Sequence, residues 1–136
     1  MNKPAAKYET VMLIDDNEID NFINQKMIEG SNFAERIYVN TSAKSAMEFL
    51  SNLALAKDIT NKLIPQFIFL DINMPIMDGF QFLEEFDKLP ADLRKGIKIL
   101  MLTTSINPAD IENSNNDKRI LQFINKPLTS AHLKSL

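Results

Sequence analysis

The chain has 136 residues, enough for one domain with a buried core, and its 45% apolar and 24% charged residues are typical of a globular protein. It has no cysteine, which excludes disulfides and thiolate metal sites and is consistent with a reducing, cytoplasmic location. A net charge of −3 with scattered Lys and Arg argues against nucleic-acid binding, and the lack of a long apolar run argues against a membrane span.

The N-terminal region begins with a polar segment and then a strand. Residues 1–7 are expected to be a flexible lead-in to a single domain over residues 8–136. A short apolar run over residues 11–14 predicts the first strand, and it ends in two adjacent aspartates.

A helix is predicted directly after this strand. Asn17 can cap it, and Glu18 and Asp20 supply the acidic residues that favour a first turn. Gly30 stands where the helix would end. Apolar residues recur at helical spacing between these limits, which predicts a stripe facing the core made of Ile19, Phe22, Ile23 and Met27.

The next strand and helix repeat this arrangement. A short strand is expected over residues 36–39, and Ser42 lies in the polar segment that opens the following helix. A polar connection over residues 56–65 leads to the strand at residues 67–70, whose continuous apolar run is typical of a strand buried on both faces of a parallel sheet. The helix between them has one apolar stripe, made of Ala43, Ala46, Met47, Leu50 and Leu53.

The central apolar strand ends at Asp71 and is followed by a loop rich in turn residues. Asp78 can form a capping box with Gln81 at the start of the next helix. A fourth strand is predicted over residues 97–102. The apolar positions expected to define the intervening helix are Phe80, Leu83 and Phe86.

The last third of the chain completes five strand–helix units. Asn107 and Pro108 are a cap and a first-turn proline for a short polar helix. A fifth strand is expected over residues 121–124 and a last helix over residues 128–136. Such alternation predicts an α/β fold, a doubly wound parallel five-stranded sheet with helices on both faces.

Polar residues whose side chains can bind a cation or react follow the predicted strands. Asp15 and Asp16 follow the first, Asp71 the third, and Thr103 and Lys126 the fourth and fifth. Because the carboxyl ends of parallel strands meet at one edge of a sheet, these side chains are expected to converge. Three neighbouring carboxylates would repel one another, and we expect Mg²⁺, a hard cation with oxygen ligands, to compensate their charge.

This set of groups suits phosphoryl transfer. A metal ion and an ammonium neutralise phosphoryl oxygens while a carboxylate attacks phosphorus and forms an acyl phosphate. Each residue alone is common where a strand turns, and Asp71 alone is as well explained by turn chemistry. Five such residues at the correct strand ends are hard to explain in that way.

Four motifs resemble those of the response-regulator receiver domain, the CheY-like family. They are LIDDN at residues 13–17, LDINMPIMDG at 70–79, MLTTS at 101–105 and INKP at 124–127. The resemblance extends from Val11 to the end of the chain. It implies a flavodoxin-like (βα)5 fold with strand order 2-1-3-4-5 and a stand-alone receiver without an output domain.

The resemblance also implies roles for individual residues. Asp71 would be the phosphoacceptor, and Thr103 and Lys126 would hold phosphoryl oxygens. The metal ligands would be Asp15, Asp16, Asp71 and the backbone carbonyl of Asn73.

Further implications concern the switch and the partners. Thr103 and Phe123 match the switch positions, and Pro127 is expected to follow a cis peptide bond. The phosphoryl donor would be a histidine kinase or a histidine phosphotransfer protein, with signalling by docking to a downstream protein and without nucleic acid or membrane. The last helix is shorter than in relatives, which suggests a short or truncated end.

An enzyme is the alternative reading. A small phosphatase or phosphotransferase of the haloacid-dehalogenase type would also use an aspartate nucleophile. Such enzymes place a second aspartate two residues after the first as general acid, where this chain has Asn73, which cannot supply a proton. We therefore expect no enzyme beyond self-catalysed phosphoryl transfer to Asp71 and autodephosphorylation.

Overall fold

The computed structural model describes residues 5–56, 63–104 and 107–136. The first residues of the expected lead-in, most of the connection over residues 56–65, and Ser105 lie outside the described residues. The five strands form one parallel sheet in the order β2-β1-β3-β4-β5, which confirms the predicted fold class and topology.

The observed elements extend the predicted ones. The strands are β1 (Tyr8–Ile14), β2 (Ala34–Asn40), β3 (Phe67–Leu70), β4 (Lys98–Thr103) and β5 (Ile120–Asn125). The helices are α1 (Glu18–Gly30), α2 (Ala43–Leu55), α3 (Gly79–Phe86), α4 (Ala91–Arg94), α5 (Pro108–Asn116) and α6 (Ser130–Lys134). The four-residue helix α4 was not predicted, and the last helix begins two residues later than expected, at Ser130.

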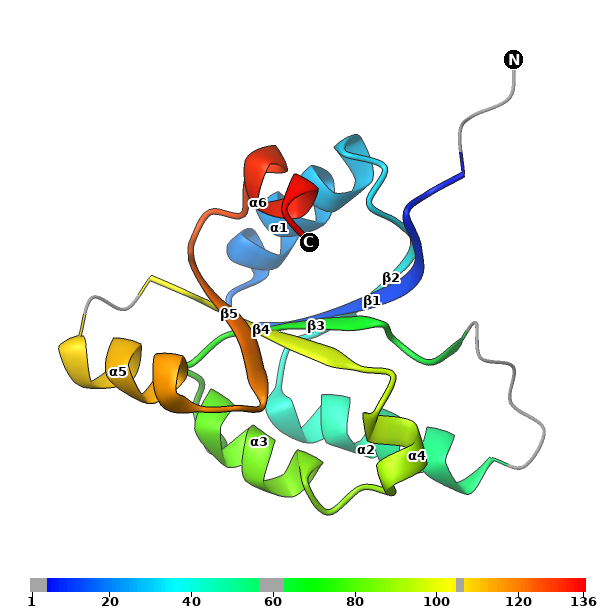
Figure 1. The fold of residues 1–136 in the computed structure, drawn as a ribbon, viewed down its shortest axis with the longest axis vertical. Helices are drawn as coiled ribbons and strands as arrows, with labels where there is room; N and C mark the ends of the chain where they lie inside the picture. Colours follow the sequence, from blue (N-terminus) through cyan, green and yellow to red (C-terminus); the bar gives the residue numbers. More distant parts are fainter. Residues whose placement is uncertain (1–4, 57–62, 105–106) are drawn as a thin grey trace.

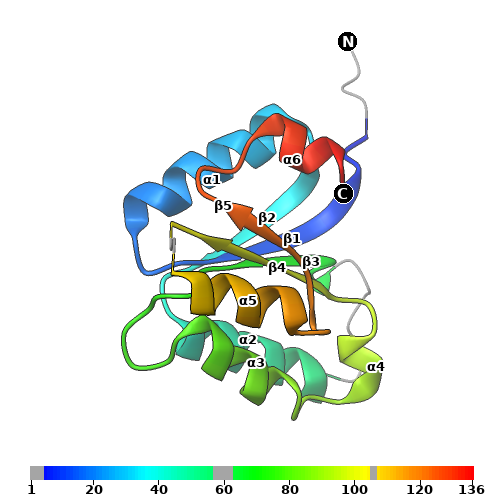
Figure 2. The same cartoon turned by 60° about the vertical axis from the view of Figure 1, so that its left-hand side comes forward.

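The sheet lies between two layers of helices (Figure 1). Helices α1 and α6 cover one face, and α2, α3 and α4 cover the other. Figure 2 shows that α5 belongs to the second layer. Since all strands are parallel, their carboxyl ends lie at one edge, on the left of Figure 1.

Strand β3 is at the centre of both cores. Ile68 and Leu70 pack in the cluster under α2 and α3, whereas Phe67 and Phe69 pack in the cluster under α1 and α6. All four residues are at most 1% exposed, as expected for a strand covered on both faces. Its carboxyl end is therefore held in position by apolar packing on two sides.

Several local predictions for the helices are confirmed. Asp78 and Gln81 form the capping box of α3, and Asn107 caps α5 with Pro108 in the first turn. The stripe of α2 is buried, with Met47 only partly so. In α3 the buried apolar side chains are Phe82, Leu83 and Phe86. Phe80 is only partly buried but packs against the same core, so the expected core face is partly met.

The predicted core-facing stripe of α1 is wrong. Its first three members are largely exposed, at 70% for Ile19, 61% for Phe22 and 44% for Ile23. Only Met27 packs partly against the core. The helix is rotated about its axis relative to the prediction, so that its buried residues are Asn21, Asn24 and Ile28.

Two hydrogen bonds account for this rotation. The side-chain amide of Asn21 donates to the carbonyl oxygen of Asp15 (2.8 Å), and Oδ1 of Asn24 accepts from the backbone N–H of Leu128 (3.2 Å). Both backbone groups lie in loops at the carboxyl edge of the sheet, where they would otherwise be buried without partners. Helix α1 therefore connects the loop after β1 to the loop after β5.

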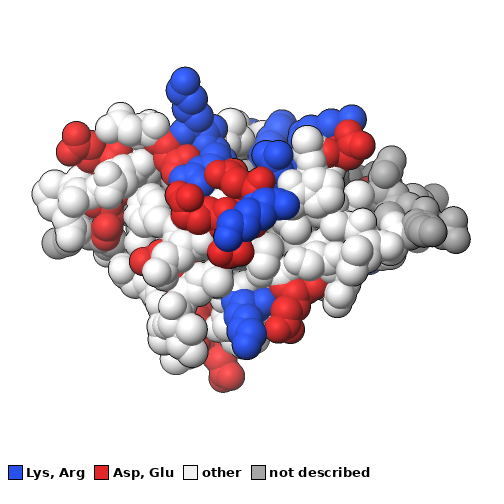
Figure 3. All heavy atoms as spheres, turned by 90° about the horizontal axis from the view of Figure 1, so that it is seen from below, with Lys and Arg blue, Asp and Glu red and all other residues white. Residues whose placement is uncertain are grey.

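The face formed by α2, α3 and α4 has mixed charge. Arg119 forms ion pairs with Asp117 (2.7 Å), Asp87 (2.8 Å) and Glu84 (3.3 Å), and hydrogen bonds from its guanidinium lower the pKa of Asp117. Figure 3 shows acidic and basic side chains next to one another on this face, without a continuous basic patch among its described residues. No helix in the described part of the chain is long and apolar enough to cross a membrane.

Candidate functional site

Backbone hydrogen bonds between neighbouring strands position the residues at the carboxyl edge. The N–H of Asp71 donates to the carbonyl of Ile14 (3.0 Å), so the first residue after β3 is fixed against the end of β1. The N–H of Lys126 donates to the carbonyl of Thr103 (2.9 Å), which fixes the residue after β5 against the end of β4. The ladder thus continues into the loops that carry the polar side chains.

Three of the predicted carboxylates come together at this edge. Oxygen atoms of Asp15, Asp16 and Asp71 lie within 4.8 Å of one another. Asp15 is 4% and Asp71 6% exposed, whereas Asp16 is exposed to solvent. Oxygen atoms at this spacing, two buried and one open to solvent, fit a hard divalent cation that keeps some of its water ligands.

Lys126 faces the same carboxylates from the loop after β5. Its side chain is 6% exposed and its ammonium contacts Asp15, Asp20 (3.0 Å) and Asp71 (3.4 Å). The contact with Asp20 was not predicted, because Asp20 was assigned only to the first turn of α1. Its position in the sequence gives no signal for this contact, which depends on the rotation of α1.

The electrostatic environment changes the proton affinity of the central carboxylate. Burial, followed by the neighbouring charge of Asp15, raises the pKa of Asp71 from 3.8 to about 6, although Lys126 acts in the opposite direction. Burial is the largest single effect on Lys126 and disfavours its ammonium, but the hydrogen bonds to Asp15 and Asp20 together with the negative charges of Asp71 and Asp15 outweigh it, and the pKa of Lys126 is raised. The site therefore carries excess negative charge that one lysine does not fully compensate.

The loop after β3 is tightly constrained. Asn73 is exposed, and Ile76 is 99% exposed with a φ of 70°, a left-handed conformation that costs a non-glycine residue about 1–2 kcal/mol. At the end of the loop, the N–H of Gly79 donates to the carbonyl of Ile72 (2.8 Å). A Cβ atom on Gly79 would lie 2.5 Å from the carbonyl oxygen of Asp71, so this position has no room for a side chain.

We expect Gly79→Ala to destabilise the protein by about 1–3 kcal/mol, the usual cost of overpacking, because the backbone of Asp71 must move. The matched control is Gly30→Ala, since Gly30 is also helical and nothing lies within 4 Å of a Cβ there. That variant should be slightly stabilising. Urea unfolding of both variants checks the prediction, and equal effects of the two substitutions would contradict it.

The two residues expected at the switch lie on one face of neighbouring strands. Thr103 is 1% exposed at the end of β4 and is paired with Asn125. Phe123 of β5 is paired with Met101, which lies two residues before Thr103 in β4, and it packs partly against the core under α2 and α3. Residues two apart in a strand point to the same face, so Thr103 and Phe123 share a face. The peptide bond between Lys126 and Pro127 is cis.

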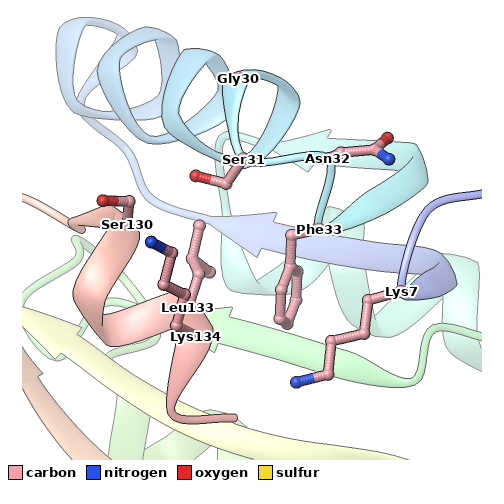
Figure 4. A pocket seen from close by; sticks show the side chains of 8 residues that line it. All are labelled: Lys7, Gly30, Ser31, Asn32, Phe33, Ser130, Leu133 and Lys134. Carbon is pink, nitrogen blue, oxygen red and sulfur yellow. The ribbon is translucent and has the colours of Figure 1, made fainter. Parts of the chain in front are cut away.

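A cavity of about 500 Å³ lies away from this edge, between the end of α1 and α6 (Figure 4). Lys7 and Lys134 lie on opposite sides of its opening, with Phe33 and Leu133 between them. The amino group of Lys7 donates to the carbonyl of Leu136. Its lining contains neither a carboxylate nor any residue of the acidic cluster, so it offers no comparable reaction centre.

Known proteins resemble the chain in both sequence and structure. It is 29% identical over 111 residues to the response regulator Rcp1 of Synechocystis sp., covering 82% of this chain and 72% of that protein. A two-component response regulator from Cytophaga hutchinsonii has 29% identity and a TM-score of 0.82, with 95% of this chain and 93% of that chain covered. The Mn²⁺-bound form of Rcp1 has 25% identity and a TM-score of 0.70, with 93% and 88% covered.

The family described as the response regulator receiver domain matches residues 11–136, almost the whole chain. This match, the strand order and the similarity to solved response regulators agree with one another. The chain belongs to the family of response regulator receiver domains.

Proposed function

We propose that Asp71 is the phosphoacceptor of a two-component phosphorelay and receives its phosphoryl group from the phosphohistidine of a histidine kinase or phosphotransfer protein. A carboxylate oxygen of Asp71 forms a bond to phosphorus while the phosphorus–nitrogen bond of the donor breaks, and the electron pair returns to the donor's imidazole. The observation that carries this proposal is the convergence of Asp15, Asp16, Asp71 and Lys126 at one sheet edge.

Mg²⁺ is the cation proposed for this site. Its ligands would be the carboxylates of Asp15, Asp16 and Asp71 with the backbone carbonyl of Asn73, and it would neutralise charge on the phosphoryl oxygens. The close spacing of the three carboxylates supports this assignment, as does the Mn²⁺-bound form of the related Rcp1. Asp16 is the exposed member of the set, so it is the ligand through which the cation would enter.

The output is proposed to depend on Thr103 and Phe123. The Thr103 hydroxyl would donate a charge-assisted hydrogen bond to a phosphoryl oxygen on Asp71, and Lys126 would bind another. Movement of Thr103 would then make room for Phe123 on the shared face of β4 and β5. A downstream protein would recognise the changed surface beside α5, in the cytoplasm.

The test is phosphorylation by acetyl phosphate with and without Mg²⁺, followed by intact-mass measurement. The wild-type protein should gain one phosphoryl group only with the metal, and Asp71→Asn should gain none, since it lacks the attacking oxygen. Asp78→Asn is the matched control, because Asp78 lies in the same loop but caps α3, and it should be phosphorylated normally. Phosphate uptake by Asp71→Asn at the wild-type level would refute the assignment.

A further inference from the structure

We propose that Asp20 is a positioning residue that holds the Lys126 ammonium in the unphosphorylated state and competes with the phosphoryl group for it. This inference rests on the proposed function of Asp71. Asp20 lies outside the cluster of Asp15, Asp16 and Asp71 that suits the metal, so its effect is exerted through the lysine.

The local structure of α1 explains why the Asp20 side chain reaches Lys126. Asp20 is the third residue after the cap Asn17, where an acidic side chain commonly accepts from the backbone N–H of the cap residue. Here that N–H donates instead to Oδ1 of Asp15 (2.9 Å). The carboxylate of Asp20 is therefore not used for capping, and its Oδ2 accepts from the ammonium of Lys126 (3.0 Å).

The rotation of α1 makes this contact possible. The hydrogen bonds of Asn21 to the loop after β1 and of Asn24 to the loop after β5 fix the helix against both loops of the site. The face that carries Ile19 and Phe22 is thereby turned to solvent. In this orientation the first turn of α1 lies beside Lys126, with the Asp20 side chain 30% exposed.

The three contacts of the ammonium are unequal. It donates hydrogen bonds to Asp15 and Asp20, whereas Asp71 is an ion-pair partner at 3.4 Å. A phosphoryl group on Asp71 would need a hydrogen bond from this ammonium. Asp20 is the partner that the ammonium can release without losing its contact to a proposed metal ligand. The negative charge of Asp20 also repels the incoming phosphoryl charge, so both effects favour the unphosphorylated state.

The consequence is that neutralising Asp20 should favour the phosphorylated state. Beryllofluoride with Mg²⁺ serves as the probe, and its affinity is measured by ¹⁹F NMR. We expect Asp20→Asn to bind it about two- to fivefold more tightly, the range expected for a partly exposed ion pair. Asp20→Glu keeps the charge and should return the affinity toward the wild-type value.

Glu18→Gln is the matched control. Glu18 is the other acidic residue in the first turn of α1, so its removal tests a general effect of charge at the helix N-terminus. The second readout needs no metal: the ¹⁵N signal of the Lys126 ammonium should change in Asp20→Asn and stay unchanged in Glu18→Gln. If Asp20→Asn acted only through the stability of α1, the ¹⁵N signal of the Lys126 ammonium would not change.

The outcomes separate the two proposals. If the wild-type protein binds beryllofluoride and Asp71→Asn does not, the proposed function stands. If Asp20→Asn and Glu18→Gln then have equal affinities and equal Lys126 signals, Asp20 is only a helix-terminal acid and the inference is overturned. If the wild-type protein does not bind the probe at all, the proposed function fails, and this inference fails with it.

Discussion

Without divalent metal, Asp71→Asn is expected to stabilise the protein by about 3 kcal/mol at pH 7.5 and to have little effect near pH 4. The cause is the pKa of Asp71, which burial and the charge of Asp15 raise from 3.8 to about 6. Because the folded-state pKa is the higher one, the protonated carboxyl stabilises the folded state below about pH 4. That contribution is lost as the pH rises through about 6.

The measurement is urea unfolding in EDTA over this pH range. The wild-type protein should lose stability between pH 4 and 7 relative to Asp71→Asn, since the asparagine side chain cannot ionise. Asp92→Asn is the control, because Asp92 has a 97% exposed side chain and its removal changes the net charge equally. If the stability of wild type and of Asp71→Asn changes with pH in parallel, ionisation of Asp71 does not destabilise the folded state and the prediction is wrong.

Replacement of Lys126 by methionine is expected to destabilise the metal-free protein by about 3–5 kcal/mol. The substitution keeps the packing of the side chain but leaves Asp15 and Asp71, both buried, without their cation. The cost should be smaller in an Asp71→Asn background, where one of the carboxylates is already neutral. Saturating Mg²⁺ should also reduce it, because the metal would supply the missing positive charge.

A double-mutant cycle with urea unfolding measures this coupling. Lys88→Met is the control, since Lys88 is 72% exposed and its pair with Glu85 should contribute less than about 1 kcal/mol. The prediction is contradicted if Lys126→Met costs no more than Lys88→Met. It is also contradicted if the cost is identical with and without the charge on Asp71.

The sequence was sufficient to predict the fold and the convergence of the carboxylates. Apolar runs that end in Asp15 and Asp71 identify strand ends, and the parallel topology then places those ends at one edge. The apolar run of β3 is a clear sequence pattern because this strand is buried on both faces. Burial on both faces also fixes where its carboxyl end lies.

The contacts of α1 could not be predicted, for a physical reason. Spacing alone favours burial of Ile19 and Phe22, but the two asparagines satisfy backbone groups in the loops of the site, which apolar side chains could not do. Asn21 bonds to a group six residues earlier and Asn24 to one 104 residues later, and neither bond leaves a periodic pattern in the sequence. The contact between Asp20 and Lys126 depends on the same rotation and was missed with it.

The two buried asparagines of α1, Asn21 and Asn24, also affect local unfolding of the domain. A helix held by two side-chain hydrogen bonds and few apolar contacts loses less on detachment than one held by a continuous apolar stripe, such as α2. We therefore expect amide hydrogen exchange to be faster in α1 than in α2 or β3. Local opening of α1 would separate Asp20 from Lys126 while the central strands stay folded, so this ion pair would be lost before the sheet unfolds.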